Sequence, residues 1–273
     1  MLCGLSVDEE IDFCVSGVSI GRWADTTINR VRIVFEDTSL IVVDKPAGLL
    51  TMATDTERSK TVYATLRAYL NNKKPAEKTF IVHRLDREAS GLLVFAKTTA
   101  VKERLQDQFK DHSAGRRYVA VVEGQVKSDN FTIRSYLAEN SAYRVYSTPN
   151  RKVGKPAVTH VHVMKRRPKT TLVEVRLETG RKHQIRVHLA ERGHPVAGDK
   201  NYGSRLNPIR RLALHGAHLD FKHPTTGKLM QFDSRWPKRS QVPEASLRVR
   251  GARHAYDGGH IITVWPNSTS VAR

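Results

Sequence analysis

Asp86 lies between two arginines, Arg84 and Arg87, directly before a turn of small residues. A continuous apolar run, Leu92–Ala96, follows the turn and predicts a buried strand. Cations on both sides favour the ionised carboxylate, and a strand that begins a few residues later would hold it rigidly. A carboxylate nucleophile needs both properties. From these residues alone, an Asp that caps the turn and pairs with a neighbouring arginine is the alternative interpretation.

The stretch His83–Lys97 closely resembles the signature of the RluA-type RNA pseudouridine synthases, which reads His-Arg-Leu-Asp-x-x-Thr/Ala-Ser-Gly-Leu-Leu. In that family the Asp is the catalytic residue, so the resemblance implies that Asp86 is the nucleophile. The length of the match favours this role over turn capping. Ala89 stands where Thr is frequent, which removes a hydroxyl but leaves the turn intact.

A second segment, Arg116–Gly124, resembles the family pattern Lys/Arg-x-Tyr-x-Ala-x-Val-x-Gly. A tyrosine at the start of a Val-rich strand is more often a core residue when the pattern is considered by itself. The resemblance implies instead that Tyr118 stacks on the target base, a contact worth roughly 1–3 kcal/mol per base. Its phenol can also help to move the C5 proton of the base.

A third segment, Gly180–Leu189, resembles the family pattern Gly-Arg-x-His-Gln-Ile/Leu-Arg-Val-His-Leu, and His194–Gly203 continues it as His-Pro-x-x-Gly-Asp-x-x-Tyr-Gly. In the family, the arginine of the Gln-Ile-Arg triplet pairs with the catalytic Asp. This implies that Arg186 keeps Asp86 ionised. A basic helix face that binds RNA is the alternative, and we favour it for the first two basic residues of the segment. The residues expected to contact RNA are His83, Arg84, Arg87, Arg181, Lys182, His183 and Gln184.

Three histidines in this segment, His183, His188 and His194, require a metal site to be considered. The first two are five residues apart, which places them about 140° apart around a helix. The spacing that aligns two zinc ligands on one face, as in His-Glu-x-x-His, is missing. We therefore expect no metal. Isomerisation of uridine leaves the atoms and the oxidation state unchanged, so we also expect no cofactor.

Two further segments support the resemblance without adding a catalytic residue. Leu212–Gly227 is similar to the family's Leu-His-Ala-x-x-Leu-x-Phe-x-His-Pro-x-Thr-Gly and is interpreted as a strand and a turn. Asp44–Leu49 resembles the family's Lys-Pro-x-Gly loop and is expected to line the RNA cleft.

The chain is strongly basic: its 273 residues carry a formal net charge of +19. Such an excess favours RNA, DNA or an anionic membrane as partner. No apolar run approaches the roughly 20 residues that span a bilayer, and the acidic start lacks the basic head of a signal peptide. Cys3 and Cys14 are expected to be free thiols in a reducing cytoplasm. Nothing in the sequence indicates an oligomer interface, so we expect a monomer.

The pattern of elements favours an α+β fold with a largely antiparallel sheet. The family resemblance implies a pseudouridine synthase fold, in which helices flank a central mixed sheet and the active-site cleft crosses that sheet. Strands are expected at 31–36, 40–45, 117–124, 158–163, 171–177, 212–221 and 229–232, helices at 61–70 and after Thr98, and an amphipathic segment at 182–191. We expect an irregular N-terminal arm at 1–30 without an S4 domain, a catalytic domain at 31–239, and a basic tail at 240–273 whose composition is typical of disordered segments.

The predicted function is isomerisation of specific uridines in structured RNA by an Asp nucleophile that acts on a flipped base. Ribosomal RNA is the favoured substrate, and transfer RNA is the other candidate. One alternative is a non-catalytic RNA-binding or ribosome-assembly factor on the same fold. Another is a hydrolase of the N-glycosidic bond, which would need a second carboxylate, with Glu88 as the nearest candidate.

Overall fold

A 12-stranded sheet runs through the larger of two units in this computed structural model, Met1–Pro237. The structure describes residues 14–15, 18–19, 22–73, 77–234, 253–257 and 260–264. Two short strands, β1 (Cys14–Val15) and β2 (Val18–Ser19), pair with each other. The smaller unit, Lys238–Arg273, contains an antiparallel pair, β15 (Arg253–Asp257) and β16 (His260–Val264). Apart from these two strands, the predicted tail at 240–273 lies outside the described residues.

The main path of the sheet has the order β10-β9-β11-β12-β8-β13-β7-β5-β4-β3, while β14 pairs with β13 and β6 with β7. Among the strand pairs that the structure describes, β7 and β13 alone are parallel. This confirms the predicted α+β class with a mixed, largely antiparallel sheet. The strands are β3 (Arg22–Ile28), β4 (Val31–Glu36), β5 (Leu40–Lys45), β6 (Phe80–Ile81), β7 (Ser90–Ala96), β8 (Gly115–Glu123), β9 (Asn130–Glu139), β10 (Val145–Thr148), β11 (Lys155–Arg166), β12 (Thr170–Leu177), β13 (Leu214–Lys222) and β14 (Leu229–Asp233).

The parallel junction between β7 and β13 depends on two facing glycines. Gly91 pairs with Gly216 and has a φ of 123°, a conformation that residues with a side chain rarely adopt. A Cβ at Gly91 would lie 2.3 Å from the carbonyl oxygen of Gly216. The Ser-Gly step of the sequence signature is therefore required by the close approach of two strands just after the turn that contains Asp86.

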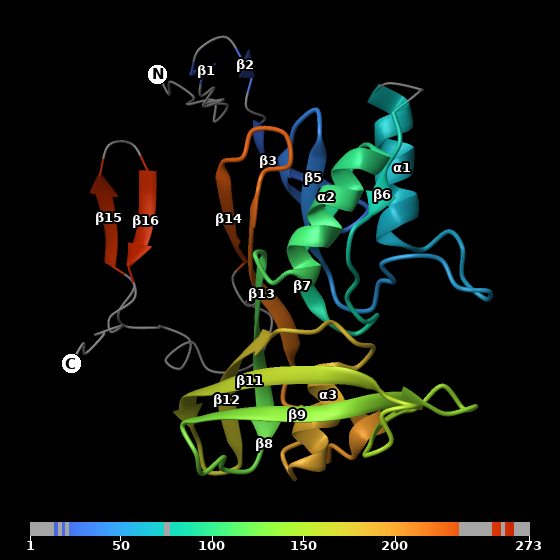
Figure 1. The fold of residues 1–273 in the computed structure, drawn as a ribbon, viewed down its shortest axis with the longest axis vertical. Helices are drawn as coiled ribbons and strands as arrows, with labels where there is room; N and C mark the ends of the chain where they lie inside the picture. The colour runs from blue at the N-terminus through green and yellow to red at the C-terminus, as the bar shows by residue number, and fades with distance from the viewer. Residues whose placement is uncertain are drawn as a thin grey trace, which may run out of the picture. The chain divides into compact units, whose positions relative to one another are not determined.

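Helices cover different parts of the sheet (Figure 1). Helices α1 (Val62–Lys73) and α2 (Thr99–Lys110) lie beside the strands of the N-terminal half, whereas α3 (Gln184–Glu191) lies against β10 and β11. A 3₁₀ turn, η1 (Lys200–Tyr202), contacts α3. Thr98 caps α2 as predicted, because its side-chain oxygen accepts a hydrogen bond from the Val101 nitrogen at 3.2 Å.

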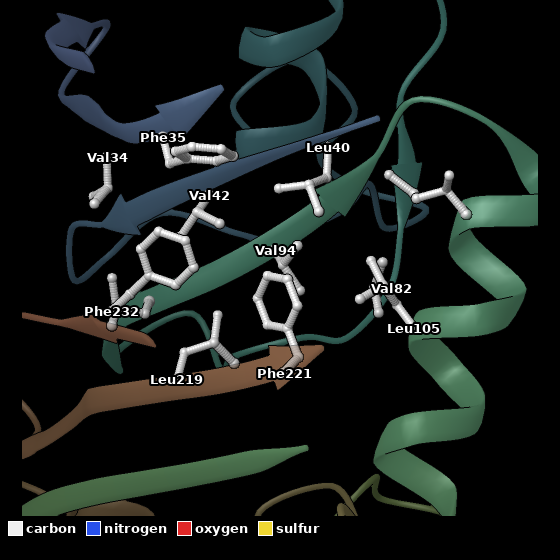
Figure 2. Close-up of a cluster of buried hydrophobic side chains, with 13 residues drawn as sticks. Val34, Phe35, Leu40, Val42, Val82, Val94, Leu105, Leu219, Phe221 and Phe232 are labelled. Carbon is white, nitrogen blue, oxygen red and sulfur yellow. The ribbon is translucent and has the colours of Figure 1, made fainter. Parts of the chain in front are cut away.

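A hydrophobic cluster joins α2 to the N-terminal half of the sheet (Figure 2). Leu105 of α2 is fully buried, and Phe221 and Phe232 stack at 5.8 Å between ring centroids on the other side of the cluster. A second cluster, centred on Ala157 and Val187, packs α3 against β9, β10 and β11. Each half of the sheet thus has a helix fixed to it by apolar contacts.

Two segments differ from what the sequence predicts for them, and several strands, β9 among them, were not predicted. Residues 22–28 form β3, which pairs with β4, although an irregular arm was predicted there. The segment predicted as amphipathic is shorter, and α3 is buried on every side, because all residues from Gln184 to Leu189 are buried. Their polar groups are hydrogen-bonded inside the protein, which a hydrophobicity pattern cannot reveal.

Candidate active site

Asp86 lies on the loop between β6 and β7, at the wall of a cleft of about 960 Å³. Its backbone carbonyl accepts a hydrogen bond from the Ala89 nitrogen at 3.2 Å, which closes the predicted small-residue turn. The carboxylate is 24% exposed, so it is accessible from the cleft. The cleft is lined by four stretches of chain, within 50–54, 81–89, 106–118 and 177–186, with Leu214.

Arg186 joins Asp86 to a second, buried carboxylate. Its Nη1 donates to Asp86 Oδ2 at 3.2 Å, while its Nε and Nη2 donate to the two oxygens of Asp199 at 2.6 and 2.8 Å. Burial opposes the charge of Arg186, but the hydrogen bonds and the negative charge of Asp199 outweigh it and raise the pKa of the guanidinium further. The predicted pairing of Arg186 with Asp86 is therefore present, and the paired hydrogen bonds to Asp199 fix its direction.

His183 approaches the same carboxylate from the residue before α3. Its φ is 53°, in the left-handed region, and its Nε2 lies 4.0 Å from Asp86 Oδ2. Its Nδ1 is 2.9 Å from the hydroxyl of Tyr202, which itself accepts from the Val145 nitrogen at 3.3 Å. We infer that the tyrosine donates to Nδ1, which leaves the His183 proton on Nε2, toward Asp86. Burial lowers the pKa of His183 against the attraction of Asp86, which favours this neutral form.

Tyr118 lies on β8, within the cleft, and is only 6% exposed. Burial raises the pKa of its phenol, and the charge of Asp86 adds to this effect although Arg116 opposes it. At neutral pH the hydroxyl therefore keeps its proton, and a phenolate is not the resting form. This state suits a stacking residue better than a ready general base.

The predicted RNA contacts occupy different depths of the cleft, and all of them line it. Arg84, Arg87 and Lys182 are exposed, and Lys182 is paired with Glu139. Arg181 is also exposed, and its Nε donates to the Pro156 carbonyl at 3.0 Å. These four cations are placed where a polyanion would meet them.

His83 and Gln184 are used largely inside the protein. The His83 Nε2 accepts from the Val94 nitrogen at 3.3 Å, and burial, with repulsion from Arg116, lowers the pKa of His83 to about 3. Gln184 is 2% exposed, and its amide bonds to four groups of the surrounding strands and loop, among them Thr159. The structure thus places these two residues where they hold the cleft wall.

The expectation for the Asp44–Leu49 loop was wrong, because the cleft is lined by the next residues, beginning at Leu50. Lys45 is fully buried, and its Nζ donates to the carbonyls of Pro46, Leu49 and Arg87 at 2.7–3.0 Å. Burial lowers its pKa to about 7, against the attraction of Asp86. The lysine therefore ties this loop to the turn that carries Asp86.

Asp199 and Tyr202 contact the residues around Asp86, and the sequence assigned no role to either. Both belong to the segment His194–Gly203, where the Gly-Asp-x-x-Tyr-Gly pattern was the available signal. Asp199 is 2% exposed, and the Arg186 guanidinium lies 4.9 Å from the Tyr202 ring centroid. Together they orient the two residues, Arg186 and His183, that face Asp86.

Glu88, the second carboxylate of the hydrolase alternative, does not line the cleft. Glu178 does, but its Oε1 is bonded to His160 at 2.6 Å. Within the described ranges no three His, Cys, Asp or Glu residues are grouped so that they could hold a metal ion, and no helix is long and apolar enough to cross a membrane.

Comparison with known proteins agrees with this geometry. The family described as RNA pseudouridylate synthase matches residues 39–191. An uncharacterized RNA pseudouridine synthase of Bacillus subtilis, YlyB, is 38% identical over 223 residues, which cover 80% of this chain and 73% of that protein. Ribosomal large subunit pseudouridine synthase D of Zymomonas mobilis is 38% identical over 226 residues, 78% of this chain and 71% of its own.

A solved structure shows the same fold. The human RNA pseudouridylate synthase domain containing 4 protein superposes with a TM-score of 0.63 at 22% identity, covering 76% of this chain and 88% of that one. The cleft carboxylate, the motifs around it and the sequence relatives lead to one conclusion: this chain belongs to the RNA pseudouridylate synthase family, in its RluA-type branch.

Proposed function

We propose that this RNA pseudouridine synthase isomerises uridines of ribosomal RNA, with Asp86 as the reacting carboxylate, Arg186 as its partner and Tyr118 as the stacking platform. The observation that carries the proposal is the Asp86–Arg186–Asp199 chain in a cleft large enough for a nucleotide. It presents one carboxylate in a fixed direction, which is what catalysis at C1′ needs.

The reaction breaks the N1–C1′ bond of uridine, turns the base and joins its C5 to C1′. The proton on C5 is lost and N1 gains one, so the atoms balance without a redox partner. The nucleotide first has to leave its stack, which costs a few kcal/mol in RNA or DNA. We propose that Arg84, exposed on the cleft wall, fills the space that the nucleotide leaves while the base stacks on Tyr118.

Three routes use the same carboxylate. Asp86 can attack C1′ directly, promote loss of the C2′ proton to give a glycal, or attack C6 of the base. In each route the negative charge of the carboxylate is consumed or shifted, while Asp199 continues to balance the charge of Arg186. The neutral His183, whose Nε2 is 4.0 Å from Asp86, can donate to the carboxylate or to a substrate oxygen beside it.

Ribosomal RNA is proposed as the substrate because several relatives carry the name ribosomal large subunit pseudouridine synthase D, from Zymomonas mobilis, Neisseria meningitidis and Pseudomonas aeruginosa. A net charge of +19 is consistent with a large polyanionic partner. We further propose a cytoplasmic monomer as the active form, and light scattering on the purified protein tests the monomer.

The substrate is tested by mapping pseudouridines as carbodiimide-induced reverse-transcription stops on total RNA from cells with and without the gene. We expect a ribosomal RNA site to disappear on deletion and to return with the wild-type protein but not with Asp86→Asn. Return of the site with Asp86→Asn would reject the carboxylate mechanism. Loss of a transfer RNA site instead would reject the proposed substrate.

A further inference from the structure

Arg116 is a second arginine of the cleft, and it has no role in the mechanism above. It lies on β8 two residues before Tyr118, so the two side chains project from the same face of the strand. Both line the cleft. Side chains at this spacing are about 7 Å apart along a strand, so a group bound by Arg116 lies close to a base stacked on Tyr118.

The guanidinium of Arg116 is held by contacts that leave its hydrogen-bond donors unused. Its Cζ lies 4.7 Å from the centroid of the Phe109 ring, which belongs to the last turn of α2. No hydrogen bond or ion pair joins it to any other residue that the structure describes. A cation–π contact involves no hydrogen bond to an oxygen or nitrogen acceptor, so the N–H groups of the guanidinium remain for another acceptor.

Arg186, in the same cleft, is different because two carboxylates bind it. A partly buried arginine without an anionic partner is a costly arrangement unless a ligand supplies the negative charge. His83 beside it stays neutral at physiological pH, since its pKa is lowered to about 3. Arg116 is therefore a cation of the cleft, and Lys110 and His112 also line the cleft.

Gly180 leaves room for this arginine. A Cβ there would lie 3.2 Å from Arg116 Nη2 and 3.3 Å from Nη1, which is tighter than an ordinary contact. The backbone of Gly180 does not have a positive φ, so its conformation does not require glycine. An alanine at position 180 would therefore press against the end of the Arg116 side chain, which lies beside both Gly180 and Phe109.

We propose that Arg116 binds a phosphodiester of the substrate RNA next to the target uridine. The planar fork of a guanidinium matches the paired oxygens of a phosphate, and Phe109 and Gly180 fix its plane. A phosphate at this position would set which nucleotide reaches Tyr118 and Asp86. This inference rests on the proposed function and names the anchor of its substrate.

The proposal is tested by measuring whether the effect of replacing Arg116 depends on the charge of one phosphodiester linkage of the RNA. Affinity is measured for synthetic RNAs that carry the mapped target uridine and a single neutral methylphosphonate, placed at each linkage around it in turn. The full-length Asp86→Asn protein is used so that no RNA is converted. We expect one linkage beside the target to weaken binding about tenfold when neutralised. With Arg116→Gln added, the same linkage should cost nothing further.

The matched control is Arg176→Gln, which removes the same charge from an exposed residue of β12 that does not line the cleft. It should leave the full effect of that linkage in place. In the otherwise wild-type enzyme, Arg116→Gln should raise KM about tenfold with kcat unchanged, because a contact to the RNA phosphate stabilises the bound substrate and the transition state equally. Arg116→Lys keeps the charge and should recover part of the loss.

Equal losses at every linkage with and without Arg116 would overturn the proposal. So would coupling of Arg116 to replacement of a flanking base rather than to a linkage, since arginine also reads guanine edges. A fall in kcat at unchanged KM in Arg116→Gln would also overturn it, because Arg116 would then act by positioning Tyr118 and not by binding the RNA. The binding measurements need no turnover, and conversion by the wild-type protein is scored on the same RNA, so failure of the anchor and failure of the proposed function are distinguishable.

Discussion

At the scale of single residues, the site is a chain of three charged side chains, Asp199, Arg186 and Asp86, in which the buried Asp199 fixes the orientation of the other two. Asp199 is the most buried of the three, and it holds Arg186 through two hydrogen bonds. With Nε and Nη2 bonded to Asp199, the Nη1 of Arg186 points toward Asp86 and donates to it. We therefore expect the reactivity of Asp86 to depend on Asp199, a carboxylate that does not line the cleft.

Asp199→Asn should separate this orienting role from the chemistry. Loss of the charge leaves a buried arginine without its main partner, which should lower the free energy of unfolding by about 3 kcal/mol. Misplacement of Arg186 should lower kcat on the order of 100-fold, with a much smaller change in KM. Urea unfolding and steady-state kinetics measure the two effects. An unchanged kcat in a folded variant would mean that Arg186 does not need Asp199.

The pairing of Asp86 with Arg186 could be predicted because both residues lie in long matches to one family's motifs. The roles of Asp199 and Tyr202 could not, because they depend on which side chains the fold brings together. Lys45 shows the same limit: its motif was recognised, but its burial among three carbonyls is a tertiary property.

At the scale of elements, the strand junction behind Asp86 is the least tolerant part of the fold. Strands β7 and β13 approach so closely at Gly91 that no side chain fits there. The turn with Asp86 is held by Lys45, which donates to the Arg87 carbonyl, and by Ser90, whose hydroxyl is 2.9 Å from His215 Nδ1. The loop that carries Asp86 is thus positioned by strands rather than by its own sequence.

Gly91→Ala should prevent folding at ordinary temperatures, because its Cβ would meet the backbone of Gly216 at 2.3–2.6 Å. The control is Gly203→Ala, whose φ of 87° is also positive but whose Cβ would meet nothing within 4 Å. It should cost only about 1 kcal/mol from backbone strain. Yield of soluble protein and circular dichroism distinguish the two. Equal stability of both variants would contradict the account of the junction.

Most elements of the sheet followed from local patterns, such as the apolar run of β7 and the Thr98 cap of α2. Helix α3 was misjudged because Gln184, Arg186 and His188 look solvent-exposed in a sequence. Each is buried with partners from other parts of the chain, such as Thr159, which bonds to both Gln184 and His188. Strand β9 was not predicted because half of its residues are neither fully buried nor fully exposed, and no alternation marks the strand.

At the scale of the larger unit, two hydrophobic clusters serve two halves of one sheet, and the active site draws on both. Asp86 comes from the half that α2 covers, and Arg186 comes from α3 in the other. Buried histidines accompany this arrangement. The pKa of His188 is lowered by burial to about 4, so the folded state resists its protonation.

The stability of the protein should fall on acidification for this reason. Between pH 6.5 and pH 4 the unfolded chain binds a proton at His188 that the folded chain does not, so the free energy of unfolding decreases as the pH falls through this window. Its contribution should be on the order of 3 kcal/mol. His188→Gln, which can keep one hydrogen bond, should flatten the decline, as measured by urea unfolding across that range. An identical slope in both proteins would show that His188 does not titrate in this way.

The central claim is that the carboxylate of Asp86 carries the reaction in this cleft. It is tested most directly with purified protein and a ribosomal RNA transcript that carries tritium at C5 of uridine, because the C5 hydrogen is lost when C5 joins C1′. We predict that the wild-type protein releases tritium and forms pseudouridine, while Asp86→Asn binds the RNA with similar affinity and releases none. Release of tritium by Asp86→Asn at the wild-type rate would contradict the account.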